Sequence, residues 1–229
     1  MKAIETVYNG YRFRSRLEAR WAVFFDAMGI KYEYEPEGFE FQDGTMYLPD
    51  FYLPEADEFF EVKGSMTGKD LHKIEMLVNE SGKAVAIGYP DLTFFATQDE
   101  GVYCFEGSCE DSWLCRCKKC NHLYFLGSRG SWTCTSCGYY DGDTGFDVIM
   151  YGNHTDKWFA PEGDAKEALE KAKGARFEHG ESGAGKNPIE KLRENYGQEP
   201  AMIAMFKLYD QGDDFAVQFI RAKAIQMNM

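Results

Sequence analysis

The chain has 229 residues, of which 44% are hydrophobic and 16% aromatic, and its formal net charge is −13. This composition supports a sizeable core and excludes wholesale disorder. No run of about 18 apolar residues is present, so the sequence predicts no membrane span. The acidic balance argues against a general nucleic-acid coat protein, although an enzyme with a local basic surface stays possible.

An amphipathic helix is predicted over residues 15–29. Ser15 fits the N-cap, Glu18 follows three residues later, and Gly29 fits the end. Glycines and prolines mark the ends of the next predicted elements. These are strands at 30–36, 39–44, 46–54 and 58–64, a helix at 69–79 and a strand at 83–89. This order predicts an α/β fold in which helices flank a mixed sheet.

The remaining chain changes in character after residue 103, which we take as the first domain boundary. All seven cysteines lie in residues 104–140, a segment too short for an apolar core of its own. Residues 141–187 combine a helical stretch at 164–177 with a glycine-rich linker, and residues 188–229 predict a helical C-terminal region.

Two carboxylates and an ammonium stand in otherwise apolar surroundings in YLPDFYLPEADEFFEVKG, residues 47–64. Glu61 and Lys63 point to the same face of a predicted strand, because side chains alternate along it. The short loop from Pro54 to Asp57 predicts an antiparallel neighbour, which brings Asp50 towards Glu61.

Two carboxylates held together repel unless a cation lies between them. Mg²⁺ or Mn²⁺ would relieve this repulsion, and such an ion would also neutralise charge on a phosphate and activate water. Lys63 could orient the attacking water or contact the phosphate. The alternative is structural: an ion pair between Glu61 and Lys63 on an exposed strand, with Asp50 as a turn residue.

Residues 8–90 resemble the PD-(D/E)XK nuclease superfamily. The resemblance rests on Pro49-Asp50 and Glu61-Val62-Lys63, with ten residues between the two acids. The order of helix, β-meander, helix and strand is similar too. The resemblance implies a restriction-endonuclease-like fold and a metal-dependent nuclease. Asp50 and Glu61 would be metal ligands, with the Val62 carbonyl and Glu18 in support, and Lys63 would be catalytic.

Glu18 has a second interpretation. Ser15 and Glu18 have the spacing of a capping box, in which the carboxylate bonds back to the helix N-terminus. One carboxylate cannot easily serve as both a cap and a metal ligand.

The cysteine segment has the spacing of a four-cysteine zinc ribbon. Thirteen residues separate the pairs Cys117-x₂-Cys120 and Cys134-x₂-Cys137. Four thiolates close the tetrahedron, so this Zn²⁺ is expected to be structural. Cys115 and His122 are alternative ligands.

Basic residues near the two predicted sites are candidates for binding nucleic acid through its phosphates. They are Arg12, Arg14, Arg16, Arg20, Lys118 and Lys119. The alternative is that these side chains only solvate the surface.

A glycine-rich loop with Gly180, Gly185 and Lys186 is similar to a phosphate-binding loop. Asn187 replaces the expected Ser or Thr, and Pro188 follows where a helix should begin, so no nucleotide cofactor is predicted.

The sequence as a whole predicts an intracellular, non-secreted nuclease that hydrolyses phosphodiester bonds, with DNA as the expected partner. The intracellular location is expected because the N-terminal sequence lacks the apolar stretch of a secretory signal. A homodimer is expected if both strands of a duplex are cut. The rival prediction is an inactive nuclease-like scaffold that binds protein or nucleic acid.

Overall fold

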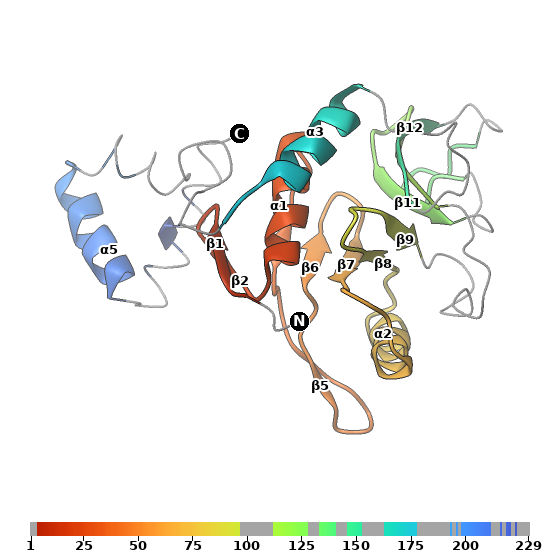
Figure 1. The fold of residues 1–229 in the computed structure, drawn as a ribbon, viewed down its shortest axis with the longest axis horizontal. Helices are drawn as coiled ribbons and strands as arrows, with labels where there is room; N and C mark the ends of the chain where they lie inside the picture. The colour runs from red at the N-terminus through yellow and green to blue at the C-terminus, as the bar shows by residue number, and fades with distance from the viewer. Residues whose placement is uncertain are drawn as a thin grey trace. The chain divides into compact units, whose positions relative to one another are not determined.

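The structure is a computed structural model, and it divides the chain into two compact units (Figure 1). One unit comprises Met1–Ala19 and Ala175–Met229, and the other comprises Arg20–Gly174. The residues described are 4–96, 112–127, 133–140, 146–152, 163–177, 193, 196, 198–211, 216, 219–220 and 223. The glycine-rich loop at 180–187 and all three predicted domain boundaries lie outside them or at their edges.

The first unit contains a β-hairpin, β1 (Thr6–Tyr8) and β2 (Tyr11–Phe13). Asn9 and Gly10 form its turn with φ of 49° and 81°, the left-handed pair that two-residue hairpin turns require. In the same unit, helix α5 (Pro200–Asp210) buries Met202 and Phe206. This helix lies in the C-terminal region that was predicted to be helical.

Helix α1 (Arg16–Met28) matches the predicted helix, and Gly29 ends it with a φ of 66°. Trp21 and Phe25 are fully buried. Their rings pack against Phe60 of the central sheet at centroid distances of 4.7 and 5.1 Å. The helix therefore covers one face of that sheet with aromatic side chains.

The central sheet has five strands in the order β3-β6-β7-β8-β9. Their bounds are Glu33–Tyr34, Phe51–Leu53, Glu58–Val62, Val85–Gly88 and Phe94–Ala96. Strands β6 and β7 pair antiparallel across the short loop, as predicted, whereas β7 and β8 pair parallel. The parallel pair is joined by helix α2 (Gly68–Ser81), so the central sheet is mixed.

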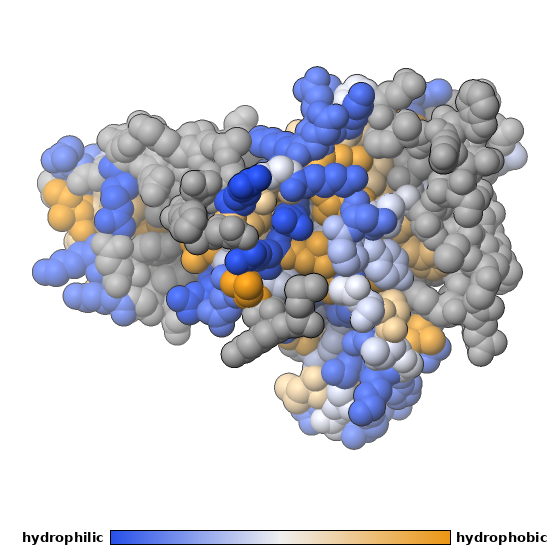
Figure 2. Space-filling model, in the orientation of Figure 1, coloured by the Kyte–Doolittle hydropathy of each residue, from blue (hydrophilic) through white to orange (hydrophobic). Residues whose placement is uncertain are grey.

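Helix α2 covers the other face of β7. Thr67 caps its N-terminus in a capping box with Asp70, and Gly82 ends it in the left-handed conformation. Ile74 and Leu77 are fully buried in a cluster with Phe59. Since α1 and α2 cover opposite faces, all five residues of β7 are buried. On the face shown in Figure 2, the surface around α2 carries both hydrophilic and hydrophobic residues.

The predicted strand 46–54 is divided in the structure. Residues Met46–Tyr47 form β5, which pairs with β4 (Phe39–Glu40) in a small separate hairpin. The chain leaves the ladder at residues 48–50 and re-enters the sheet as β6. Pro49 has no N–H group to donate to a ladder, which accounts for a break at this place.

A second sheet has the order β11-β10-β12, with bounds Leu123–Gly127, Ser112–Cys117 and Phe146–Tyr151. Strand β12 lies in the segment for which only a helix and a linker were predicted. The predicted helix is present as α3 (Gly163–Gly174). The prediction of a mixed α/β fold is confirmed, and the described residues hold four helices, several sheets and a cluster of four cysteines.

Within the described part of the chain, no helix combines the length and the apolar character needed to cross a bilayer.

Candidate metal sites

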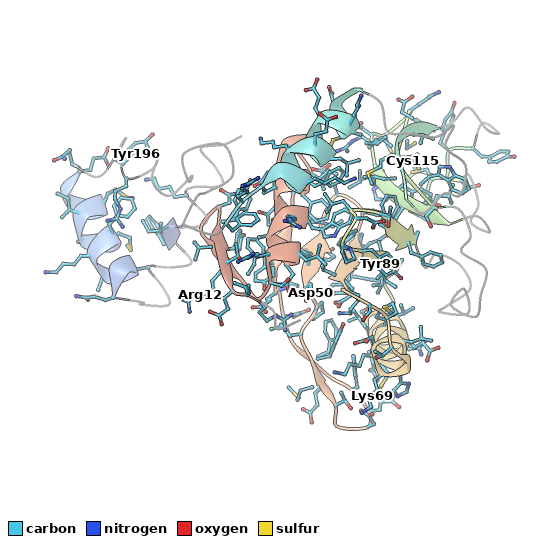
Figure 3. All side chains as sticks on the ribbon, in the orientation of Figure 1. Arg12, Asp50, Lys69, Tyr89, Cys115 and Tyr196 are labelled. Carbon is cyan, nitrogen blue, oxygen red and sulfur yellow. The ribbon has the colours of Figure 1, made fainter. Side chains whose placement is uncertain are left out.

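The first candidate site lies where β7 ends beside the break between β5 and β6. Strand β7 supplies Glu61, and Lys63 follows directly after it. Asp50 is the last residue before β6 (Figure 3). Asp50 is only 4% exposed and Glu61 is 0% exposed, so both carboxylates are held within the core. Burial without a partner would be costly for either charge.

Backbone groups hold the two carboxylates in a reciprocal arrangement. The N–H of Val62 donates to Oδ2 of Asp50 at 2.8 Å. The N–H of Asp50 donates to Oε1 of Glu61 at 3.1 Å. Each acid is therefore bound to the backbone of the segment that carries the other, and the break at Pro49 and Asp50 makes this possible.

Lys63 supplies a positive charge to both acids. Its Nζ lies 2.6 Å from Oε2 of Glu61 and 3.7 Å from Oδ2 of Asp50. Burial by itself would lower the pKa of Lys63, but the charges of Glu61 and Asp50 outweigh it and raise that pKa above its usual 10.5. The two carboxylates thus converge on one cationic nitrogen, and this donor set fits a divalent ion with oxygen ligands.

Tyr47 is a member of this site that the sequence did not reveal. Its hydroxyl donates to Oε2 of Glu61 at 2.5 Å. Burial, followed by the charge of Glu61, raises the pKa of Tyr47 far above 10, so the hydroxyl keeps its proton. Tyrosines are common in this aromatic chain, and only the fold brings this one to Glu61.

Glu18 takes part in the cap of α1. The N–H of Glu18 donates to Ser15 Oγ at 3.1 Å, and Ser15 Oγ donates to Glu18 Oε1 at 2.7 Å. Oε2 accepts the N–H of Arg14 at 3.0 Å, one residue before the expected back-bond. Half of the predicted capping box is therefore present: Ser15 accepts the Glu18 N–H, but the Glu18 carboxylate bonds back to Arg14 and not to the Ser15 backbone. Glu18 belongs to the first unit, and its role as a metal ligand stays a prediction, as does that of the Val62 carbonyl.

The predicted phosphate-binding residues differ in their surroundings. Arg12 and Arg14 are exposed, and Arg16 and Arg20 are half-buried. Arg12 lies 3.7 Å from Glu5. Lys118 lies 3.6 Å from Asp147, and the Nζ of Lys119 lies 5.7 Å from the centre of the Tyr139 ring.

The second candidate site is the cysteine cluster. The Sγ atoms of Cys117, Cys120, Cys134 and Cys137 all lie within 4.8 Å of one another. Cys117 and Cys137 are 3.8 Å apart, and Cys120 and Cys134 are 3.6 Å apart. Thiolates placed tetrahedrally about 2.3 Å from a zinc ion would lie about 3.8 Å from each other. The four cysteines can therefore hold a metal ion such as zinc.

The two cysteine turns have the same backbone geometry. In the first, Asn121 has a φ of 61° and donates to the carbonyl of Cys117 at 2.8 Å. In the second, Gly138 has a φ of 65° and donates to the carbonyl of Cys134 at 2.8 Å. This repetition is the paired-knuckle arrangement that the spacing predicted.

Backbone N–H groups lower the pKa of one of the four thiols, that of Cys117. Burial opposes ionisation of Cys117, but hydrogen bonds from the N–H groups of Cys120 and Lys119 lower its pKa to about 7. Thiolates are the form that binds metal.

Cys115 and His122 lie outside the metal cluster. Cys115 is fully buried and contacts the carbonyl of Tyr124 at 3.6 Å, and burial raises its pKa to about 12. The His122 ring lies 3.4 Å from Thr135 Oγ1. In the residues that the structure describes, the four cysteines are the one group of three or more side chains close enough to share a metal.

Comparison of the chain with protein-family models, with curated proteins and with solved structures gives no match.

Proposed function

We propose that the chain is a metal-dependent nuclease that hydrolyses phosphodiester bonds, with DNA as its substrate. One observation carries the proposal: Asp50, Glu61 and Lys63 meet at the end of a buried strand, and their acids are 4% and 0% exposed. Burying two acids and a lysine together is costly for a scaffold unless the pairing is very good. An active site accounts for this cost.

In the proposed site Asp50 and Glu61 hold Mg²⁺ or Mn²⁺, with the Val62 carbonyl as a further candidate ligand. The ion would supply charge neutralisation at the phosphate and a more acidic water. Lys63 turns from the carboxylates to the attacking water or to a phosphate oxygen.

A restriction-endonuclease-like core is part of the same proposal. It is supported by the succession of α1, the β6–β7 hairpin, α2 and the parallel strand β8. The zinc ribbon would assist substrate binding through Lys118 and Lys119, both exposed, and Arg12, Arg14, Arg16 and Arg20 would contact flanking phosphates. Cutting both strands of a duplex would require a homodimer.

A cleavage assay on single-stranded, duplex, nicked and branched DNA, with Mg²⁺ or Mn²⁺, tests the proposal. Asp50→Asn and Lys63→Ala are expected to lower the rate at least a hundredfold. Asp57→Asn and Lys83→Ala are matched controls, because this second acid–lysine pair is bonded at the protein surface. Equal cleavage by all four variants and the parent would refute the nuclease.

An inactive scaffold is the second candidate function. The net charge of −13 favours it, since such a field slows association with DNA. Lys63 also satisfies Glu61 without any metal. Titration of Mn²⁺ into the parent and into Glu61→Gln separates the two: a binding event lost in the variant supports the nuclease, and no binding to either protein supports the scaffold.

A further inference from the structure

We propose that Tyr47 is the positioning residue that fixes the outer carboxylate oxygen of Glu61 for metal binding. This inference rests on the proposed function. The two residues are fourteen positions apart, yet the Tyr47 hydroxyl donates to Glu61 Oε2 at 2.5 Å. Neither the sequence motif nor the family resemblance assigns a role to Tyr47.

The carboxylate of Glu61 is held at both of its oxygens. Oε1 accepts the N–H of Asp50, while Oε2 accepts both Tyr47 and Lys63. Two anchors on opposite oxygens fix the plane of the carboxylate, whereas one anchor leaves it free to rotate about its last bond.

Only one of the two donors on Oε2 can remain there during catalysis. Lys63 must leave Glu61 to reach the water or the phosphate. Tyr47 has no such second role, so it is the donor that keeps Glu61 oriented after Lys63 has moved. Groups that hydrogen-bond to metal ligands orient them in this way.

The ring of Tyr47 is itself held in place by its neighbours, as a positioning role requires. Its ring stacks on Phe41 with centroids 5.7 Å apart and an interplanar angle of 29°. The Nζ of Lys73, on α2, lies 5.7 Å from the centre of the same ring. The ring also packs against the buried cluster beneath α2. The hydroxyl is thus supported from the β4–β5 hairpin and from α2.

Calorimetric titration of Mn²⁺ into the metal-free full chain tests the inference directly. Tyr47→Phe keeps the ring and removes only the hydroxyl, and it is expected to weaken Mn²⁺ binding about tenfold or more. Tyr52→Phe is the matched control: its hydroxyl donates to Asp57 at 2.5 Å in a solvent-exposed hydrogen bond. It is expected to bind Mn²⁺ like the parent.

Kinetics provide a second measurement. A residue that orients a ligand without touching DNA should lower kcat in Tyr47→Phe and leave KM for DNA unchanged. A higher metal concentration should restore part of the lost rate, which a purely structural defect would not allow.

The outcomes separate the two proposals. Mn²⁺ binding by Tyr47→Phe within twofold of the parent overturns the positioning role and leaves the nuclease standing. No Mn²⁺ binding by the parent overturns both. If Tyr47→Phe folds poorly, Tyr47→Gln and Tyr47→Leu replace it, since both lack the ring and only the Gln can donate. Equal affinity in that pair would also refute the role.

Discussion

Lys63 balances the charge of the acidic site. Its ammonium lies within 4 Å of both carboxylates, and its side chain is 17% exposed. Because its pKa is raised in the folded state, its stabilising contribution is fully present below the unfolded value of about 10.5. That contribution is lost as the pH rises through the folded-state pKa.

Replacing Lys63 by Met should lower the free energy of unfolding at pH 7 by about 3 kcal/mol, because it removes the buried ammonium that pairs with both acids. Urea denaturation measures this change. Mg²⁺ at millimolar concentration should return part of the stability, since a bound ion replaces the missing charge. Lys83→Met, at the exposed pair with Asp57, should cost about 1 kcal/mol or less and show no response to Mg²⁺. A Mg²⁺-independent Lys63→Met would contradict a metal site here.

The cysteines permit a comparison between neighbouring residues of one type. Cys134→Ser removes a ligand and should abolish binding of the expected one zinc per chain, whereas Cys115→Ser, two residues from Cys117, should retain it. Elemental analysis of the purified proteins gives the result. Zinc lost from Cys115→Ser and kept in Cys134→Ser would show that the ligand set is wrong.

At the scale of elements, α1 and β8 approach each other closely through aromatic rings. A Cβ atom on Gly88 would lie 2.6 Å from carbon atoms of both Phe60 and Trp21. No side chain larger than hydrogen fits there, so β8 requires glycine at this position for reasons of space.

Gly88→Ala should therefore destabilise the protein by about 1–3 kcal/mol through overpacking. Gly68→Ala is the matched control, because its Cβ would meet nothing within 4 Å at the first residue of α2. It should raise stability by about 0.5 kcal/mol. Thermal unfolding compares the two, and a Gly88→Ala protein as stable as the parent would mean that Trp21 and Phe60 can move apart.

Elements with a strong local signal were predictable. Helices α1 and α2 have N-caps at Ser15 and Thr67 and apolar residues at helical spacing, and the β6–β7 hairpin has a short loop. The break at Pro49 was not predicted, because the aromatic residues on either side of it all favour a strand. The approach of Asp50 to Glu61 was predicted from the short loop between their strands, whereas Tyr47 reaches the site through the fold of a separate hairpin.

At the scale of the whole molecule, the sheet β11-β10-β12, which we call the ribbon, packs against the central sheet. Phe125 of β11 packs against Phe60 and Phe94 at 5.8 and 5.2 Å. Arg116 of β10 bonds Glu55 in the β6–β7 loop at 2.9 Å, and Ser112 accepts the N–H of Ala96. These contacts lie within the unit Arg20–Gly174 and could not be deduced from either segment alone.

Removal of zinc should therefore weaken the central sheet as well as the ribbon. Unfolding of the chain treated with a zinc chelator should show a lower Tm than the zinc-loaded protein, with the ribbon and sheet still melting together. Near-ultraviolet circular dichroism, which reports the packed aromatic rings, follows the transition. An unchanged central-sheet transition after zinc loss would indicate that the two sheets are independent.

The reciprocal bonds at Asp50 and Glu61 have one more consequence. They cross between β6 and β7 in both directions, from Val62 to Asp50 and from Asp50 to Glu61. A slip of one residue between these strands would turn every side chain to the wrong face. It would also break both hydrogen bonds and leave the two buried carboxylates without them. The two carboxylates thus favour one register of the β6–β7 pair, because any other register would leave both acids buried without these bonds.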